Sequence, residues 1–257
     1  MSFLAALSFL TIIPLPRRLE IKTEAIERSI VYFPLVGLII GLMLVGLNWV
    51  LGLLLPTVLV NGLLIVALTV ITGALHLDGF VDTCDGIGGI KTVEARWAAM
   101  RDSRTGAFGV IGVFLLLLIK YLSLSSVPQN LLMATLVLMP VIGRWAMVYA
   151  VFAHSYAKTA GLGNLFKQGA NWQRFALATI IFLVIAIGLA LLANVNYFYL
   201  ASLAIIVGVW VIVIIMSTYF KRKFSGLTGD TYGAINEVAE VCVLIFISLL
   251  AHNRWLI

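Results

Sequence analysis

The sequence predicts an all-α membrane protein, a polytopic bundle of about seven transmembrane helices. Hydrophobic residues make up 62% of the chain, charged residues make up only 11%, and the mean hydropathy is +1.11. A soluble globular domain needs more polar surface than this composition provides. The apolar stretches are also continuous, whereas strands of a transmembrane β-barrel alternate polar and apolar residues over about ten positions. We therefore expect helices to cross the membrane.

The first segment, 1–30, precedes the predicted bundle. Its apolar run before Pro14 is shorter than the roughly 17–25 residues that a spanning helix needs. No positive residue stands ahead of this run, and no small-residue cleavage site follows it. We predict an uncleaved interfacial or re-entrant helix that ends at Pro14–Pro16.

Seven apolar stretches are long enough to cross a hydrocarbon core of ~30 Å as helices. They form one integral membrane domain over 1–257, in which the bundle occupies 31–251. The predicted spans are 31–55, 57–77, 107–127, 129–152, 172–193, 197–220 and 234–251.

Basic residues gather on one side of these spans. Fourteen of the 17 Lys and Arg lie there: Arg17, Arg18, Lys22, Arg28, Lys91, Arg96, Arg101, Arg104, Lys158, Lys167, Arg174, Lys221, Arg222 and Lys223. Arg254 lies on the other side, and Lys120 and Arg144 fall within spans. The positive-inside rule places the N-terminus and the long polar connections in the cytoplasm. We therefore expect the reaction to take place on the cytoplasmic side. Topology also accounts for the basic pI of 9.5 without nucleic acid.

The stretch "HLDGFVDTCDG" contains three of the eleven carboxylates, Asp78, Asp82 and Asp85. On a helix these three side chains point within a wedge of about 60°. Negative charges this close repel one another unless a cation compensates them. Carboxylate oxygens suit Mg²⁺, which binds jointly to substrate phosphates, so we predict a magnesium site. The alternative is a solvated helix cap. His76 is suited to bind a phosphate or move a proton, although a lone histidine is more often structural.

A second stretch, "MRDSRTGAFG" at 100–109, places Asp102 between Arg101 and Arg104. Guanidinium groups match phosphate oxygens, and the N-terminus of a helix offers free N–H groups to an anion. This pattern predicts phosphate recognition. The alternative is an ordinary cytoplasmic anchor that contains an Asp–Arg ion pair.

A third stretch, "SGLTGDTYGAINEVAE", places Asp230 in a Gly-rich loop and Glu237 and Glu240 at the start of the last span. Ionisable side chains inside a membrane are costly, so they are functional candidates. The same rule applies to Lys120 and Arg144. Pairing of these two cations with the glutamates, or snorkelling toward the interface, explains them equally well.

With these motifs in place, the chain resembles the polytopic cobalamin synthases, also called adenosylcobinamide-GDP ribazoletransferases. The combination H-x-D-G-x-x-D-x-x-D-G with D-S-R-x-G-x-x-G carries most of this resemblance, which covers nearly the whole chain. The matching stretches are "PLVGLIIG" at 34–41, "HLDGFVDTCDG" at 76–86, "MRDSRTGAFG" at 100–109, "GLGNLF" at 161–166 and "TGDTYGAINEVAE" at 228–240.

The resemblance implies a step of cobalamin biosynthesis, the assembly of the nucleotide loop. In this reaction a hydroxyl of α-ribazole, or of its 5′-phosphate, attacks the cobinamide-linked phosphorus of adenosylcobinamide-GDP and releases GMP. The implied cofactor is Mg²⁺, and the implied location is the inner membrane with the active site facing the cytoplasm. The expected partners are the two substrates and the lipid bilayer. Association into a homo-oligomer or with other enzymes of the corrinoid pathway is left open.

The expected metal ligands are Asp78, Asp82 and Asp85, which would bridge the diphosphate through Mg²⁺. We expect Asp230 and Glu237 to complete the metal shell or to meet the second substrate.

The expected phosphate contacts are Arg101 and Arg104. Asp102 is the expected group that orients or deprotonates the ribazole hydroxyl, with His76 behind it.

Three other functions fit parts of the pattern. A CDP-alcohol phosphotransferase also uses Asp-rich sites, but its D-G-x-x-A-R arrangement is missing because Thr83 and Cys84 follow Asp82. A prenyltransferase of the ubiquinone type would need a second D-x-x-x-D motif, which does not follow Asp230. A cation transporter would place its acids along the bilayer midplane, whereas these acids concentrate on one face.

Overall fold

The computed structural model describes residues 1–14, 21–89, 92–157, 161–192 and 198–253. Over these ranges the chain folds into helices, with one isolated bridge between Tyr156 and Leu227. The elements are α1 (Ser2–Leu10), α2 (Thr23–Ser29), the 3-10 turn η1 (Ile30–Tyr32), α3 (Phe33–Gly52), α4 (Thr57–Ile71), α5 (Leu75–Ile87), α6 (Val93–Ala99), α7 (Ala107–Ser125), α8 (Gln129–Ala153), α9 (Leu162–Gly169), α10 (Trp172–Leu192), α11 (Phe198–Phe224) and α12 (Gly229–His252).

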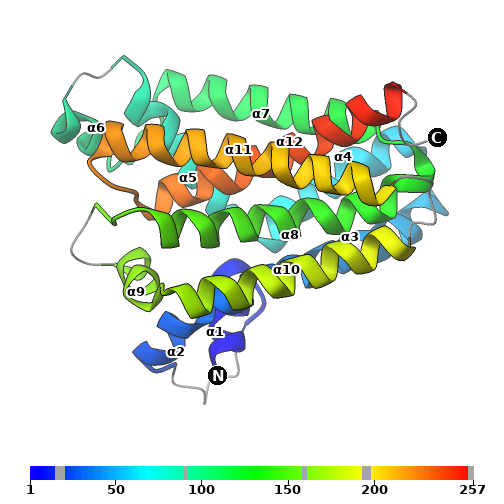
Figure 1. Cartoon of the computed structure of the whole chain (residues 1–257). Helices are drawn as coiled ribbons and strands as arrows, with labels where there is room; N and C mark the ends of the chain where they lie inside the picture. The colour runs from blue at the N-terminus through cyan, green and yellow to red at the C-terminus, as the bar shows by residue number, and fades with distance from the viewer. Residues whose placement is uncertain (15–20, 90–91, 158–160, 193–197, 254–257) are drawn as a thin grey trace.

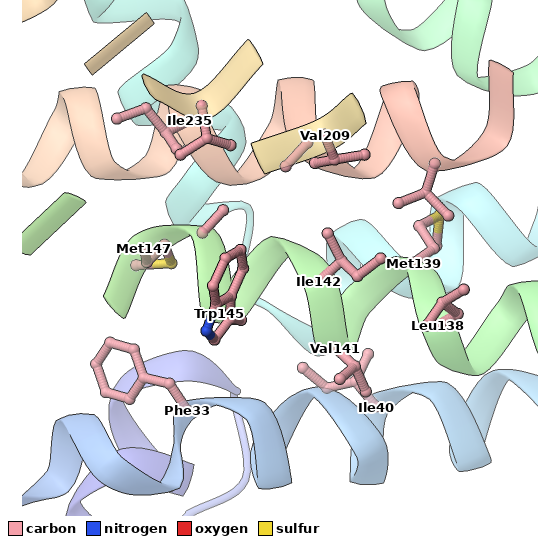
Figure 2. Close-up of a cluster of buried hydrophobic side chains, with 14 of the residues drawn as sticks. Phe33, Ile40, Leu138, Met139, Val141, Ile142, Trp145, Met147, Val209 and Ile235 are labelled. Atoms are coloured by element: carbon pink, nitrogen blue, oxygen red, sulfur yellow. The ribbon is translucent and has the colours of Figure 1, made fainter. Parts of the chain in front are cut away.

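The long helices run side by side in a bundle around α8 (Figure 1). Helix α8 is buried along almost its whole length, between α3 on one side and α11 and α12 on the other. Figure 2 shows Ile40 of α3 beside Val141 of α8, with Val209 and Ile235 across the bundle. Close packing of this kind stabilises helices in lipid, where burial of apolar area gains little.

Glycines bring α3 and α8 into close contact. A Cβ atom added at Gly37 would lie 2.6 Å from the carbonyl oxygen of Pro140, and one added at Gly41 would lie 2.6 Å from Cα of Val137. Small residues let the backbones of membrane helices approach one another. The stretch "PLVGLIIG" therefore serves helix packing.

Six described helices are long and apolar enough to span a membrane, and the count becomes seven if the bent pair α4–α5 is one span. This agrees with the predicted bundle of about seven helices. Large apolar side chains are exposed along α7, α10 and α11, including Phe114, Val184 and Ile215. Such a surface is expected to face lipid.

The predicted span 57–77 is not one straight helix, because the chain bends by 89° between α4 and α5. Two hydrogen bonds close α4: Ala74 N–H donates to the carbonyl of Thr69 at 2.8 Å, and Gly73 N–H donates to that of Val70 at 2.9 Å. This is the bonding pattern of a Schellman motif, with Gly73 at φ +60°. The break starts a second helix whose residues carry the acidic motif.

The last helix begins five residues earlier than the predicted span 234–251. Thr228 accepts a hydrogen bond from Thr231 N–H, and the Thr231 hydroxyl accepts one from Thr228 N–H, which forms a capping box. Asp230 therefore belongs to the first turn of α12 rather than to a loop.

The N-terminal helix α1 ends at Leu10, ahead of the predicted stop at Pro14–Pro16. Ile12 N–H donates to the carbonyl of Ile71 at 2.8 Å, so this segment lies against the end of α4.

The short helices α6 and α9 lie at one end of the bundle, and the last turn of α12 lies at the other (Figure 1). Several of the basic residues used for the topology prediction occupy that first end, among them Arg96, Lys167 and Lys221. Arg17, Arg18, Lys91, Lys158 and Arg254 lie outside the described residues. The assignment of this end to the cytoplasm stays a prediction.

Candidate active site

A cavity of about 250 Å³ lies where α5 and α12 meet α1, α3, α8 and α9. It combines a polar group of side chains with an apolar wall, as ligand sites commonly do. Its lining residues are Phe9, Phe33, Leu75, His76, Asp78, Met147, Val151, Tyr156, Leu162, Gly163, Phe166, Gly229, Asp230 and Tyr232.

Two glycines place the acidic ends of α5 and α12 side by side. A Cβ atom at Gly79 would lie 2.8 Å from Cα of Asp230, and one at Gly233 would lie 2.9 Å from the carbonyl oxygen of His76. The backbones of the two helices are thus in direct contact. Asp78, in the first turn of α5, and Asp230, in the first turn of α12, consequently line the same cavity.

The connection after α8 forms the next part of the wall. Ala157 N–H donates to the carbonyl of Leu227 at 2.8 Å, and Leu227 N–H donates to that of Ser155 at 2.9 Å. This pairing holds the Tyr156 ring stacked 6.2 Å from the ring of Tyr232. Burial and the nearby Asp230 charge both raise the pKa of Tyr156, so its phenol remains protonated at neutral pH.

Helix α9, which carries "GLGNLF", is attached to the end of α8. The Lys167 ammonium donates to the carbonyls of Val151 and Phe152 at 3.0 and 2.9 Å. A cation at the C-terminus of a helix satisfies carbonyls that have no partner within the helix. Gly163 lies directly against the Tyr156 ring, and Phe166 of the same helix lines the cavity.

A second hollow lies at the other end of α5 and includes Asp85, Asp102 and Arg104. The Asp85 carboxylate accepts hydrogen bonds from the N–H groups of Gly106 and Gly109, both at 2.7 Å. It therefore caps the N-terminus of α7. Asp85 and Asp78 line different hollows.

Asp102 forms a forked ion pair with Arg104. The guanidinium donates to Asp102 Oδ1 from Nε at 3.1 Å and to Oδ2 from Nη2 at 2.9 Å. These bonds lower the pKa of Asp102 from 3.8 to about 2. Asp102 lines the second hollow, whereas His76 lines the cavity together with Asp78 and Asp230. The expected role of Asp102 as a base stays a prediction.

Four charged side chains meet inside the bundle. Lys120 of α7 donates to Glu237 and to Glu240, both at 2.7 Å, and Arg144 of α8 donates to Glu240. Pairing of Lys120 and Arg144 with the intramembrane glutamates is thus confirmed. It also corrects the expectation for Glu237, which is committed to Lys120 and does not line the cavity.

His76 and Tyr232 line the cavity and are buried. Both ring nitrogens of His76 and the hydroxyl of Tyr232 are buried without a hydrogen-bond partner among the described residues. A buried polar group without a hydrogen-bond partner costs free energy, so such a group often binds a ligand or a water molecule.

The described residues contain no group of three His, Cys, Asp or Glu side chains placed to hold a metal ion. The single three-aspartate site is therefore corrected to two places along α5, because Asp85 bonds the start of α7. Asp78 and Asp230 still fit the needs of Mg²⁺, which commonly takes one or two carboxylates plus substrate phosphates. Asp82 lies one turn from Asp78 on the same face.

The sequence motifs do not predict the aromatic part of the cavity. Tyr156, Tyr232, Phe9, Phe33 and Phe166 come from five separate elements or connections. Two of them lie within "GLGNLF" and "TGDTYG", and this proximity to the motifs was the available signal.

Comparison with known proteins gives consistent results. The family model described as cobalamin-5-phosphate synthase matches residues 2–248. The protein of Geotalea daltonii named adenosylcobinamide-GDP ribazoletransferase is 36% identical over 96% of this chain and 97% of its own. The protein of the same name from Roseiflexus sp. is 38% identical over 98% of this chain and 90% of its own length. The protein of the same name from Caldanaerobacter subterraneus subsp. tengcongensis is 32% identical over 97% of this chain and 98% of its own length. No solved structure matches.

Proposed function

Because the chain belongs to the cobalamin-5-phosphate synthase family, we propose that it joins ribazole to adenosylcobinamide-GDP in cobalamin biosynthesis. The observation that carries this proposal is the cavity between α5 and α12. It combines residues of "HLDGFVDTCDG", "GLGNLF" and "TGDTYG", which lie far apart in the sequence.

The reaction is a phosphoryl transfer. The ribazole hydroxyl oxygen bonds to the phosphorus attached to cobinamide, the bond from this phosphorus to the bridging oxygen breaks, and GMP leaves. The hydroxyl proton passes to a base. Catalysis of such a step depends mainly on positioning and on stabilising the charge of the phosphoryl group and the leaving group.

We propose that Asp78 and Asp230 hold Mg²⁺, with Asp82 next to them on α5. A divalent ion held by these carboxylates would neutralise charge on the diphosphate. The support is the shared cavity and the direct backbone contact of Gly79 with α12. Exchange of Asp82 for Asn should abolish turnover while the protein still inserts and folds.

His76 is the proposed proton acceptor, in preference to Asp102. It lines the cavity, and neither ring nitrogen has a partner among the described residues. The Tyr232 hydroxyl, which is similarly placed, is suited to orient the ribose. Arg101 remains a proposed phosphate contact from the second stretch, whereas Arg104 is occupied by Asp102.

We further propose that this end of the bundle faces the cytoplasm at the inner membrane. The support is the set of basic residues in the connections around α6 and α9 and at the end of α11.

The direct test is GMP release from adenosylcobinamide-GDP by purified protein supplied with α-ribazole and Mg²⁺. The expected result is stoichiometric formation of GMP and adenosylcobalamin. Ion flux into vesicles without any GMP formation would instead support a transporter and refute this function.

A further inference from the structure

Three phenylalanine rings from three helices meet at the apolar wall of the cavity. The centroid of Phe166, on α9, lies 4.7 Å from that of Phe9, on α1, and 5.4 Å from that of Phe33, on α3. We call Phe9, Phe33 and Phe166 the phenylalanine cluster. Phe33 and Phe166 are almost fully buried in the protein, and Phe9 is half-buried.

The lining of the cavity contains both charged and apolar groups. Asp78 and Asp230 come from the first turns of α5 and α12, and the phenylalanine cluster comes from α1, α3 and α9. A fitting ligand is consequently amphipathic, with a phosphate or hydroxyl at one end and a flat apolar group at the other. Aromatic walls bind flat rings by offset or edge-to-face contacts.

The volume of the cavity limits which part of the substrates of the proposed reaction can enter it. At about 250 Å³ the cavity is smaller than the roughly 300–1,000 Å³ of sites for drug-sized ligands. It can enclose one fused two-ring base, whereas a corrin macrocycle must remain outside. Two flat bases then remain, the dimethylbenzimidazole of ribazole and the guanine of GDP.

The apolar lining distinguishes these two bases. Guanine carries donors and acceptors around its edge, and their burial without partners is costly. Dimethylbenzimidazole presents two methyl groups and one ring nitrogen, so it suits a wall made of phenylalanine, Leu162, Met147 and Val151. We infer that the cavity is the binding site for the ribazole base, with the phenylalanine cluster holding its ring and the ribose directed toward Asp78 and Asp230. This inference rests on the proposed function.

The first test is equilibrium binding of α-ribazole to the full-length protein in nanodiscs, by calorimetry. We expect Phe166→Leu and Phe9→Leu each to weaken ribazole binding about threefold to tenfold, because each loses ring contacts. GMP binding should change little. Phe114→Leu, on the exposed side of α7, is the matched control and should bind like the wild type.

Unchanged ribazole affinity in both cluster variants would overturn the inference. So would a selective loss of GMP affinity, which would assign the cavity to guanine. The two variants lie on different helices, and Phe9 is only half-buried. If Phe166→Leu fails to fold, the ribazole affinity of Phe9→Leu still tests the inference.

A series of bases supplies a readout that a purely structural role would not change. The wild type should prefer dimethylbenzimidazole to a larger three-ring base, and Phe166→Leu should reduce this preference. A structural defect would lower turnover with every base equally. If the protein binds ribazole through the cluster but releases no GMP, the proposed function is refuted and the ribazole site is supported. If the protein releases GMP and the cluster variants do so at the wild-type rate, only the ribazole site is refuted.

Discussion

The Asp85 carboxylate joins the end of α5 to the start of α7 through hydrogen bonds from the N–H groups of Gly106 and Gly109. Helical spacing correctly predicts that Asp78, Asp82 and Asp85 share one face of a helix. It does not predict that α7 begins against that face, so that Gly106 and Gly109 donate to Asp85. The contact joins residues more than twenty positions apart, and a one-dimensional pattern holds no information about it.

Replacement of Asp85 by Ala should lower stability. The variant loses two charge-assisted hydrogen bonds at the start of α7, a loss of about 1–2 kcal/mol by analogy with helix caps. Thermal unfolding of the purified protein in detergent measures the change. Asp78→Ala, at an exposed position of the same helix, is the control and should unfold near the wild-type temperature. Equal losses in both variants would contradict the capping role.

The Asp102–Arg104 pair should open only at strongly acidic pH. Arg104 lowers the pKa of Asp102 to about 2, so the carboxylate stays charged and paired above pH ~4. The pairing is lost as the pH falls from about 4 through 2. A nitroxide at Ser103→Cys should report increased mobility over this range. Arg104→Gln should move the midpoint upward, toward 3.8, and an unmoved midpoint would contradict the pairing.

At the scale of elements, hydropathy predicts where helices cross the membrane but not where they bend. The apolar run that starts at Thr57 continues to Leu77, so a single span was the natural prediction. The bend depends on backbone hydrogen bonds and positive φ at Gly73 and Ala74. Glycine permits such φ values but does not require them, and alanine rarely adopts them. The packing of neighbouring elements decides the outcome.

The contact between α5 and α12 should be sensitive to one methyl group. Gly79→Ala places a Cβ 2.8 Å from Cα of Asp230, so the two helices must separate. We expect turnover to fall at least tenfold, because displacements of about 1 Å can reduce rates a hundredfold. Initial rates of GMP release measure this effect.

Gly46→Ala is the matched control, since a Cβ at that position of α3 meets nothing within 4 Å. It should keep wild-type turnover and be neutral or slightly more stable. Similar rates in Gly79→Ala and Gly46→Ala would show that close packing of α5 on α12 is not needed.

At the scale of the whole molecule, a group of charges inside the bundle links three helices. Lys120 on α7, Arg144 on α8, and Glu237 and Glu240 on α12 compensate one another. The sequence indicates these four residues because charges within spans are rare. Pairing of the two cations with the glutamates is one of the explanations that the sequence allows. Which cation meets which glutamate depends on the rotation of each helix, which composition does not determine.

Removal of one charge from this group should be more harmful than removal of a pair. Lys120→Met leaves Glu237 buried without its cation, which costs about 3–5 kcal/mol in comparable buried pairs. Lys120→Met combined with Glu237→Gln removes both charges and should recover part of this loss. Thermal unfolding of both variants in one detergent provides the comparison. A double variant less stable than the single one would contradict the proposed pairing.

We propose that Asp78 and Asp230 act together in one site although they lie on different helices. A double-mutant cycle of Asp78→Asn and Asp230→Asn, followed by GMP release at saturating Mg²⁺, measures whether they do. Residues that act as one unit give non-additive losses. We predict that each single variant loses at least a hundredfold in turnover and that the double variant loses little more than either one. Near-normal turnover in either single variant, or losses that multiply in the double variant, would contradict it.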